Sequence, residues 1–175
     1  MAVYSIWDQS AESGATTSFT GTLGTEFNLS QPGKLTGIWV YSSTGATPLP
    51  TIIAIYDYDT TALVPGTLNN SPSWSGAAGS GWIDCVYDGS VTLTTGINYA
   101  VAVYVAGTVF FSAYAVPGWP TVSGIIDGTA GVYDTTSGSI NFPETNAGAY
   151  TYWIDVEITT VAPPQAPYTG FMSAM

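Results

Sequence analysis

The stretch Ile154-Asp-Val-Glu-Ile-Thr159 alternates apolar and polar side chains near the end of the chain. Successive side chains of an extended strand point to opposite faces, so its aliphatic residues share one face. Asp155 and Glu157 share the other face, and we expect both carboxylates to point into water. This pattern predicts a β-strand that packs one face against a hydrophobic core.

Similar β-rich runs recur along the chain, separated by 20 glycines and 11 prolines. No run of helical length keeps an amphipathic apolar stripe without glycine, proline or β-branched clusters. Short strands with frequent turn signals are typical of a β-sandwich or barrel. The predicted strands are Val3–Trp7, Ser18–Leu29 (bent at Gly21 or Gly24), Leu35–Ser42, Thr51–Tyr58, Trp82–Tyr87, Val91–Leu93, Asn98–Val105, Val109–Tyr114, Gly131–Asp134 and Tyr150–Thr160. The predicted loops are Ser42–Pro50, Leu63–Gly81, Val116–Gly128 and Thr135–Ala149.

The run Leu35–Tyr41 has apolar residues on both of its faces. Alternation places Leu35 with Trp39 and Tyr41 on one face, and it places Ile38 with Val40 on the other. We therefore expect a central strand that is covered on both sides.

A long stretch, Gly89–Ile126, carries no charged residue and imitates a membrane span. Its residues are largely β-branched and aromatic, however, and Gly107 interrupts them. Two strands joined by a tight Ala106-Gly107-Thr108 turn fit better than a membrane helix of about 20 residues.

The composition excludes several classes of function. The 175 residues include 12 acids, one lysine, no arginine and no histidine, and the formal charge is −11. Binding of nucleic acid or anionic lipid needs many cations, so neither is expected, and we expect no membrane insertion. Histidine-based catalysis and metal binding are impossible, and Cys85 cannot form an internal disulfide. We expect Cys85 to be a small core residue and expect no cofactor.

The first ten residues have neither a basic segment nor an apolar segment, so they do not read as a cleavable export signal. Two interpretations are open: the protein is used without export by such a leader, or a leader has already been removed. Met1 favours the first.

Several short motifs, taken together and in order, resemble those of a known family. They are Leu23-Gly-Thr-Glu-Phe27, Pro32-Gly-Lys-Leu-Thr-Gly-Ile38 with Tyr41, Gly81-Trp82, Val91-Thr-Leu-Thr-Thr-Gly96, and Tyr99 with Tyr104. The chain resembles an uncharacterised β-sandwich domain family of bacterial extracellular proteins, with relatives among virion proteins of actinobacterial phages. The resemblance implies an all-β, antiparallel, jelly-roll-like sandwich in an accessory or surface role, with no catalytic residues to transfer.

Paired carboxylates are the only general acid–base groups that the sequence offers. Asp57 and Asp59 lie at a predicted strand end and would face the same side. Three interpretations are open: solvated acids that close a strand, ligands of a calcium ion, or the acid pair of a hydrolase. The first interpretation is favoured, so we expect neither catalytic residues nor an established metal site.

Six tryptophans and twelve tyrosines make the aromatic content more informative than the charges. Large aromatic rings fill cores and subunit interfaces, and they also stack on sugar rings. We expect Trp39, Trp82 and Trp153 to be packing residues because they lie within predicted strands. The candidates for a carbohydrate platform lie in or beside loops: Trp74, Trp119 and Tyr114.

The chain is expected to form one sandwich domain, residues 1–160, followed by an extended Pro-rich arm, residues 161–175. The arm is interpreted either as a strap on a neighbouring subunit or as a frayed terminus. Its candidate partner-binding residues are Pro163, Pro164, Pro167, Tyr168 and Phe171.

A surface poor in charge and rich in aromatic residues suits a protein that is covered by neighbours. We expect a non-enzymatic bacteriophage virion protein, either a capsid-decoration or a minor tail protein. It would assemble in the host cytoplasm as a homo-oligomer, bury apolar area and β-edges against major capsid or tail proteins, and be exposed on the particle surface. The alternative is a glycan-binding module that contacts the host cell envelope. A carboxylate-dependent hydrolase is a distant third possibility.

Overall fold

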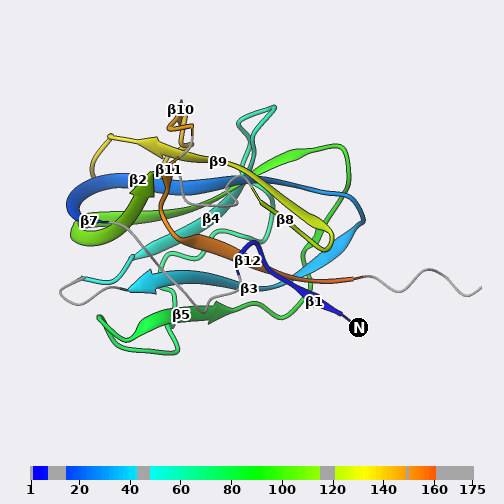
Figure 1. Cartoon of the computed structure of the whole chain (residues 1–175), viewed down its shortest axis with the longest axis horizontal. Coiled ribbons are helices and arrows are strands. Elements are labelled where there is room, and N and C mark those ends of the chain that lie inside the picture. The colour runs from blue at the N-terminus through cyan, green and yellow to red at the C-terminus, as the bar shows by residue number, and fades with distance from the viewer. Residues whose placement is uncertain (1, 8–14, 43–47, 115–120, 149, 161–175) are drawn as a thin grey trace, which may run out of the picture.

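The structure of the chain, a computed structural model, describes residues 2–7, 15–42, 48–114, 121–148 and 150–160. For residues 15–17, 108–114 and 121–123 it describes the backbone alone. This part of the chain has no helix and twelve strands, which form two antiparallel sheets packed face to face (Figure 1). The expected all-β antiparallel sandwich is confirmed. No helix in the described residues has the length and apolar character needed to span a membrane.

The first sheet contains five strands and lies in the lower half of Figure 1. Its order is β1 (Val3–Tyr4), β12 (Ile154–Thr160), β3 (Gly33–Ser42) and β5 (Gly81–Val86), and β6 (Thr92–Leu93) pairs with the start of β3. The chain's one lysine, Lys34, is exposed in β3 between Thr92 and Thr159. As expected, the run Leu35–Tyr41 lies in a central strand. The expectation that this strand is covered on both sides is wrong, because Trp39 and Tyr41 are partly exposed.

The second sheet contains seven strands and forms the upper layer. Its order is β10 (Thr145–Asn146), β9 (Ile126–Asp134), β2 (Ala15–Leu29), β7 (Asn98–Tyr114) and β11 (Tyr150–Thr151), with β4 (Ile52–Asp57) also paired to β7 and β8 (Thr121–Ser123) to β9. From β2 to β5 the chain alternates between the two sheets. Neighbours within each sheet therefore come from distant parts of the sequence.

Inward-facing side chains of both sheets form one apolar core. Phe27 of β2 is fully buried and stacks on Tyr99 of β7, with ring centroids 5.6 Å apart. The Thr25 hydroxyl crosses between the sheets and donates to the Ile154 carbonyl at 2.8 Å. Cys85 is buried in this core as predicted. Fully buried members from the first sheet include Leu35, Ile38, Val156 and Ile158, and those from the second include Ile53, Ile55, Val101 and Val103.

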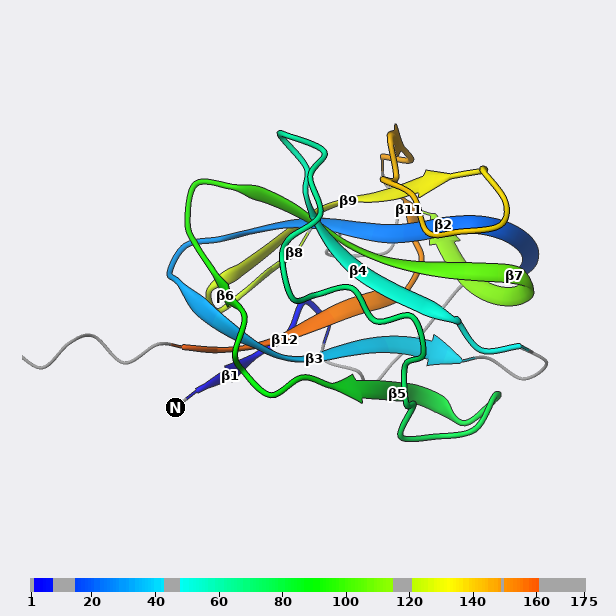
Figure 2. The ribbon, with the colours of Figure 1, turned by 180° about the vertical axis from the view of Figure 1, so that it is seen from behind.

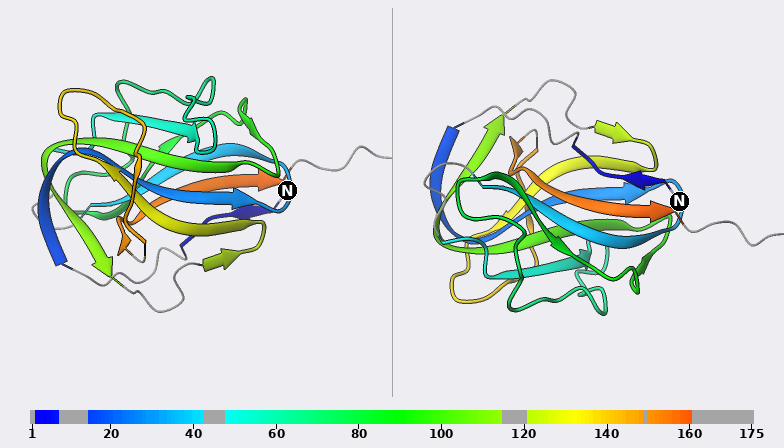
Figure 3. Two further views of the ribbon diagram at one scale, coloured as in Figure 1. Left: turned by 90° about the horizontal axis from the view of Figure 1, so that it is seen from above. Right: turned by 90° about the horizontal axis from the view of Figure 1, so that it is seen from below.

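The predicted turn at Gly107 is wrong. The two strands that it was expected to join are one continuous strand, β7, and Gly107 forms a bulge within it. Ala106 pairs with Thr20 and Thr108 with Phe19, so Gly107 has no partner in the register, and its φ of 71° suits glycine. Its N–H donates to the Thr20 hydroxyl at 2.8 Å. The ends of β2 and β7 near this bulge bend together away from the sheet (Figure 3).

The predicted strand Tyr150–Thr160 is two strands in different sheets. β11 pairs with β7 of the second sheet, and β12 pairs with β3 of the first. Between them Trp153 adopts a positive φ of 52°, which breaks the extended conformation and redirects the chain. The aliphatic face of β12 is nevertheless buried as predicted.

A bulge at Thr36 changes the predicted faces of β3. Leu35 pairs with Ile158 and Gly37 pairs with Glu157, so Thr36 has no partner in the register. This extra residue turns Leu35 into the core with Ile38, and it leaves Trp39 on the outer face. The predicted grouping of Leu35 with Trp39 was therefore wrong.

The predicted loop Val116–Gly128 contains β-structure where it is described. Thr121–Ser123 forms β8, and Ile126 begins β9 five residues before the predicted start at Gly131. Pairing between these two strands supplies backbone hydrogen bonds that the local sequence pattern did not reveal.

The long segment between β4 and β5 covers the outer edge of β4. Ile53 exchanges two backbone hydrogen bonds with Asn69, each 2.9 Å long, and the Thr67 hydroxyl accepts the Ile55 N–H at 3.0 Å. Figure 2 shows this segment running beside β4 and then on to β5. The edge is therefore protected by the chain itself.

Phe27→Ala tests the core. Removing this buried ring is expected to lower the free energy of unfolding by about 3–5 kcal/mol, because a cavity remains between the sheets. Val86→Ala is the control, since Val86 is 75% exposed and should change the value by less than about 0.5 kcal/mol. Chemical denaturation measures both, and equal effects would contradict the assigned core.

Candidate functional site

The predicted carboxylates Asp57 and Asp59 are both used in the turn that follows β4. Asp57 Oδ1 accepts the backbone N–H of Asp59 at 3.0 Å and that of Thr60 at 3.1 Å. The Asp59 carboxylate accepts the Asn98 backbone N–H at 3.3 Å and its side-chain amide at 3.1 Å. No cluster of three or more histidine, cysteine or acidic residues occurs in the described part of the chain. A cation site at these carboxylates stays an untested prediction.

The outer face of the second sheet carries Glu26, which lies between Ala100 and Ala130 in the register. Burial raises the pKa of the Glu26 carboxyl, and repulsion from Asp59 adds to the rise. Part of this face is covered by the chain itself, because Phe142 packs on the ring of Tyr56 with centroids 5.7 Å apart.

Of the predicted carbohydrate candidates, Trp74 is the one whose side chain the structure describes. The Trp74 ring is half-buried against the core, and its indole N–H donates to the Pro50 carbonyl at 3.0 Å. Tyr114 ends β7, and its backbone pairs with Tyr150, but its side chain is outside the description. Also outside the described residues are Trp119 and the arm residues Pro163, Pro164, Pro167, Tyr168 and Phe171.

The outer face of the first sheet instead assembles aromatic rings from three segments. Tyr41 of β3 pairs with Trp82 of β5, and their ring centroids are 5.8 Å apart. Trp82 meets Trp153 edge-on at 6.3 Å, and Trp7 packs on Trp153 at 4.7 Å. Trp39 lies two residues before Tyr41 on the same face of β3. We call Trp39, Tyr41, Trp82 and Trp153 the aromatic face.

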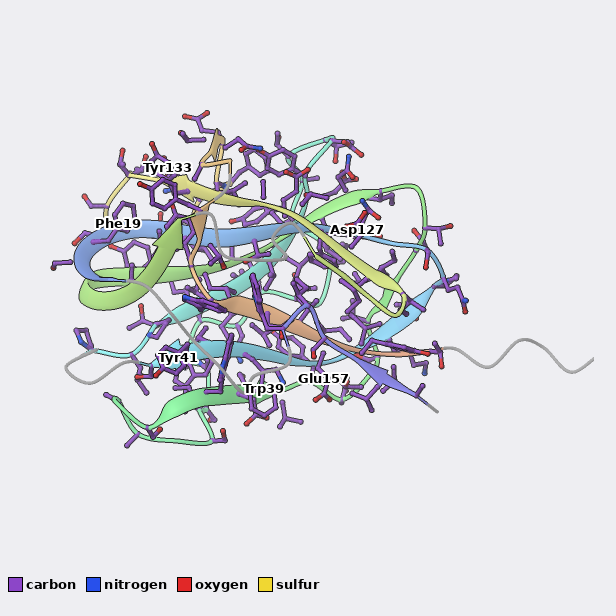
Figure 4. All side chains as sticks on the ribbon, viewed as in Figure 1. Phe19, Trp39, Tyr41, Asp127, Tyr133 and Glu157 are labelled. Atoms are coloured by element: carbon purple, nitrogen blue, oxygen red, sulfur yellow. The ribbon has the colours of Figure 1, made fainter. Side chains whose placement is uncertain are left out.

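Trp39, Tyr41 and Trp82 are partly exposed residues, although the indole nitrogens of both tryptophans are buried, and Trp153 is buried at the border of the face. The Trp39 ring lies along β3 over Gly37, since a Cβ on Gly37 would be 3.4 Å from the indole nitrogen. The same Cβ would lie 3.3 Å from the Glu157 Cβ, so a larger residue at position 37 would crowd both Glu157 and Trp39. Figure 4 shows Trp39 and Tyr41 on β3 with Glu157 nearby, away from the Phe19–Tyr133 pair of the second sheet.

Carboxylates flank the aromatic face on both neighbouring strands. Asp84 of β5 lies directly across from Trp39, and Glu157 of β12 lies across from Gly37. The Thr36 hydroxyl donates to Glu157 Oε1 at 2.8 Å, which leaves further acceptor capacity on that carboxylate. An exposed apolar side chain, Val86, lies at the same end.

Asp155 does not point into water as predicted. It is fully buried, and its Oδ1 accepts the backbone N–H groups of Ile6 and Val156, each at 2.7 Å. Its Oδ2 accepts the Trp7 N–H at 3.1 Å. The segment that contains Ile6 and Trp7 therefore crosses this side of β12 instead of continuing β1, which ends at Tyr4. These hydrogen bonds hold Trp7 against the border of the aromatic face.

Comparison with known families relates the chain to an uncharacterised domain. A family model described as a domain of unknown function, DUF4082, matches residues 5–154, which is most of the chain. The chain belongs to the DUF4082 family. No curated protein matches it. The expected resemblance to an uncharacterised domain family is thus confirmed, and the DUF4082 match includes the whole aromatic face.

The sequence analysis did not predict that these rings gather on one outer face, although Trp153 is buried as predicted. Trp39 and Trp82 were assigned to packing because they lie within predicted strands. The available signal was the alternation within Gly81–Val86, which sets Trp82 and Asp84 on one side and buried Ile83 and Cys85 on the other. That pattern indicates that Trp82 and Asp84 share the outer face of the sheet.

Asp155→Asn tests the buried carboxylate. Asparagine offers one acceptor oxygen and places an N–H₂ group near backbone donors. The free energy of unfolding should therefore fall by about 1–3 kcal/mol. Hydrogen exchange should accelerate at the Ile6 and Trp7 amides. Asp88→Asn is the control, because that carboxylate is exposed and accepts local hydrogen bonds from the backbone and side chain of Ser90. Unchanged exchange at both amides would contradict the assignment.

Asp57→Ala and Asp57→Asn together test the turn after β4. Asparagine can accept the same backbone N–H groups, so Asp57→Asn should change the free energy of unfolding by less than about 0.5 kcal/mol. Asp57→Ala removes the acceptor and should lower the free energy of unfolding by about 1 kcal/mol. Thermal denaturation with and without calcium measures both variants. A calcium-dependent loss in Asp57→Asn would instead favour a cation site.

Proposed function

We propose that the chain is a non-enzymatic structural protein of a bacteriophage virion, either a capsid-decoration or a minor tail protein. The observation that carries the proposal is the chemistry of its surface, which has one cation and presents apolar side chains at both edges of the first sheet. Val3 of β1 is 59% exposed and Val86 of β5 is 75% exposed. Such a surface supports stable association without ion pairs, because burial yields about 25 cal/mol per Å².

Contacts with neighbours would use side-chain faces more than β-edges. The edge of β4 is already covered by the segment between β4 and β5. Ser75 in that segment also donates its N–H to the Asp84 carbonyl of β5 at 2.8 Å. The expected burial of β-edges against neighbours therefore does not apply to β4, and assembly as a homo-oligomer on major capsid or tail proteins would depend on exposed apolar and aromatic side chains.

Cryo-electron microscopy of phage particles tests the proposal. Density for this sandwich on the outside of the head or tail, in several copies, is the expected result. Particles purified from a phage lacking the gene should lose that density and bind the added protein again. A chain that is absent from the particles and leaves their composition unchanged would overturn the proposal.

A second candidate function, glycan binding at the host envelope, is favoured by one observation. Partly exposed tryptophan and tyrosine rings lie beside carboxylates on the outer face of the first sheet. Aromatic rings with adjacent hydrogen-bonding groups suit ligands that have one apolar side and a polar rim. The two functions are compatible in a tail protein exposed on the particle.

A further inference from the structure

We propose that the aromatic face, with Asp84 and Glu157, binds a chain of neutral hexopyranose sugars. This inference rests on the second candidate function and assigns its residues and ligand class. The Trp39 ring would stack on one sugar, the adjoining Tyr41–Trp82 pair would contact the next, and the two carboxylates would accept hydrogen bonds from sugar hydroxyls.

The placement of the rings fits a chain ligand. Trp39 and Tyr41 are two residues apart on one strand, which separates their Cα atoms by about 7 Å along β3. Trp82 extends the surface sideways onto β5, where its ring centroid lies 5.8 Å from that of Tyr41. The C–H groups on one side of a pyranose ring are apolar and carry partial positive charge, so they pack on the negative face of an aromatic ring. The planes of Tyr41 and Trp82 are tilted by 65° to each other, so successive sugars would meet these rings at different angles.

The charges on this face favour a neutral ligand with many hydroxyl groups. Asp84 and Glu157 lie on opposite sides of β3, and each carboxylate can only accept hydrogen bonds when ionised. Sugar hydroxyls are donors, so both rims of a bound sugar would find acceptors. An anionic sugar or phosphate would be repelled by these carboxylates and by the overall charge of −11.

A second copy of the chain fits this face less well. A two-fold contact would bring the same patch together from both molecules, with Asp84 and Glu157 facing like charges. Removing these carboxylates from water without a cation is costly, and the chain has a single lysine. The corresponding face of the second sheet differs, because Ile140 and Phe142 already pack over Tyr56 and Ala54 there.

Titration calorimetry of the purified full chain tests the inference with cellohexaose, mannohexaose and a β-galactan hexasaccharide. At least one should bind the unaltered chain. Trp39→Ala and Trp82→Ala should each weaken that binding by about tenfold or more, as expected for a central aromatic contact. The double variant Asp84→Asn with Glu157→Gln keeps both shapes and should weaken it by about fivefold, because charged acceptors are stronger. If a tryptophan variant does not fold, this double variant tests whether the assigned site binds the sugar.

Tyr58→Ala is the matched control, because it removes a partly exposed ring from the outer face of the second sheet. Its affinity should equal that of the unaltered chain. Undiminished binding by Trp39→Ala, Trp82→Ala and the double variant would overturn the assigned site but leave glycan binding standing. Failure of all three hexasaccharides to bind the unaltered chain would overturn both. Sedimentation could also show that the unaltered chain is a dimer and that Trp39→Ala is a monomer. This result would assign the aromatic face to an interface between copies and would overturn the inference.

Discussion

The pairing of β3 with β12 determines which side chains of the first sheet enter the core. Side chains alternate between faces with a period of two, so one extra residue reverses the pattern on one side of a bulge. The bulge at Thr36 allows Leu35 and Ile38 both to face inward. From that point Trp39 and Tyr41 face outward, beside residues of β5 and β12. Both the core and the aromatic face therefore depend on this register.

Several of the described aspartates are stabilised by backbone N–H groups, because the sequence offers only one side-chain cation. Asp57 accepts two N–H groups in a turn, and Asp155 accepts three across the surface of β12. Asp134 accepts the Thr136 N–H at 3.2 Å and its hydroxyl at 3.1 Å. Hydrogen bonds to an ionised acceptor are stronger than neutral ones, so these contacts stabilise loops and a terminal segment without ion pairs.

The sequence predicted the features that depend on local alternation and composition. The sandwich, the central position of the run Leu35–Tyr41 and the buried face of β12 all follow from such patterns. The errors arose where distant segments decide the outcome. Gly107 suits both a turn and a bulge, and its pairing with β2 decides between them. The buried state of Asp155 depends on residues about 150 positions earlier in the chain, which no local pattern reveals.

The position of Lys34 limits how the folded chain can be digested. Proteases of the trypsin type cleave after lysine or arginine, and the sequence contains one such residue. The Lys34–Leu35 bond lies in a paired strand, and its N–H donates to the Val91 carbonyl at 3.0 Å. A protease must pull its substrate into an extended, unpaired conformation in its own cleft, so it must first open the central strand of this sheet. The native domain is thereby protected from an entire class of digestive enzyme.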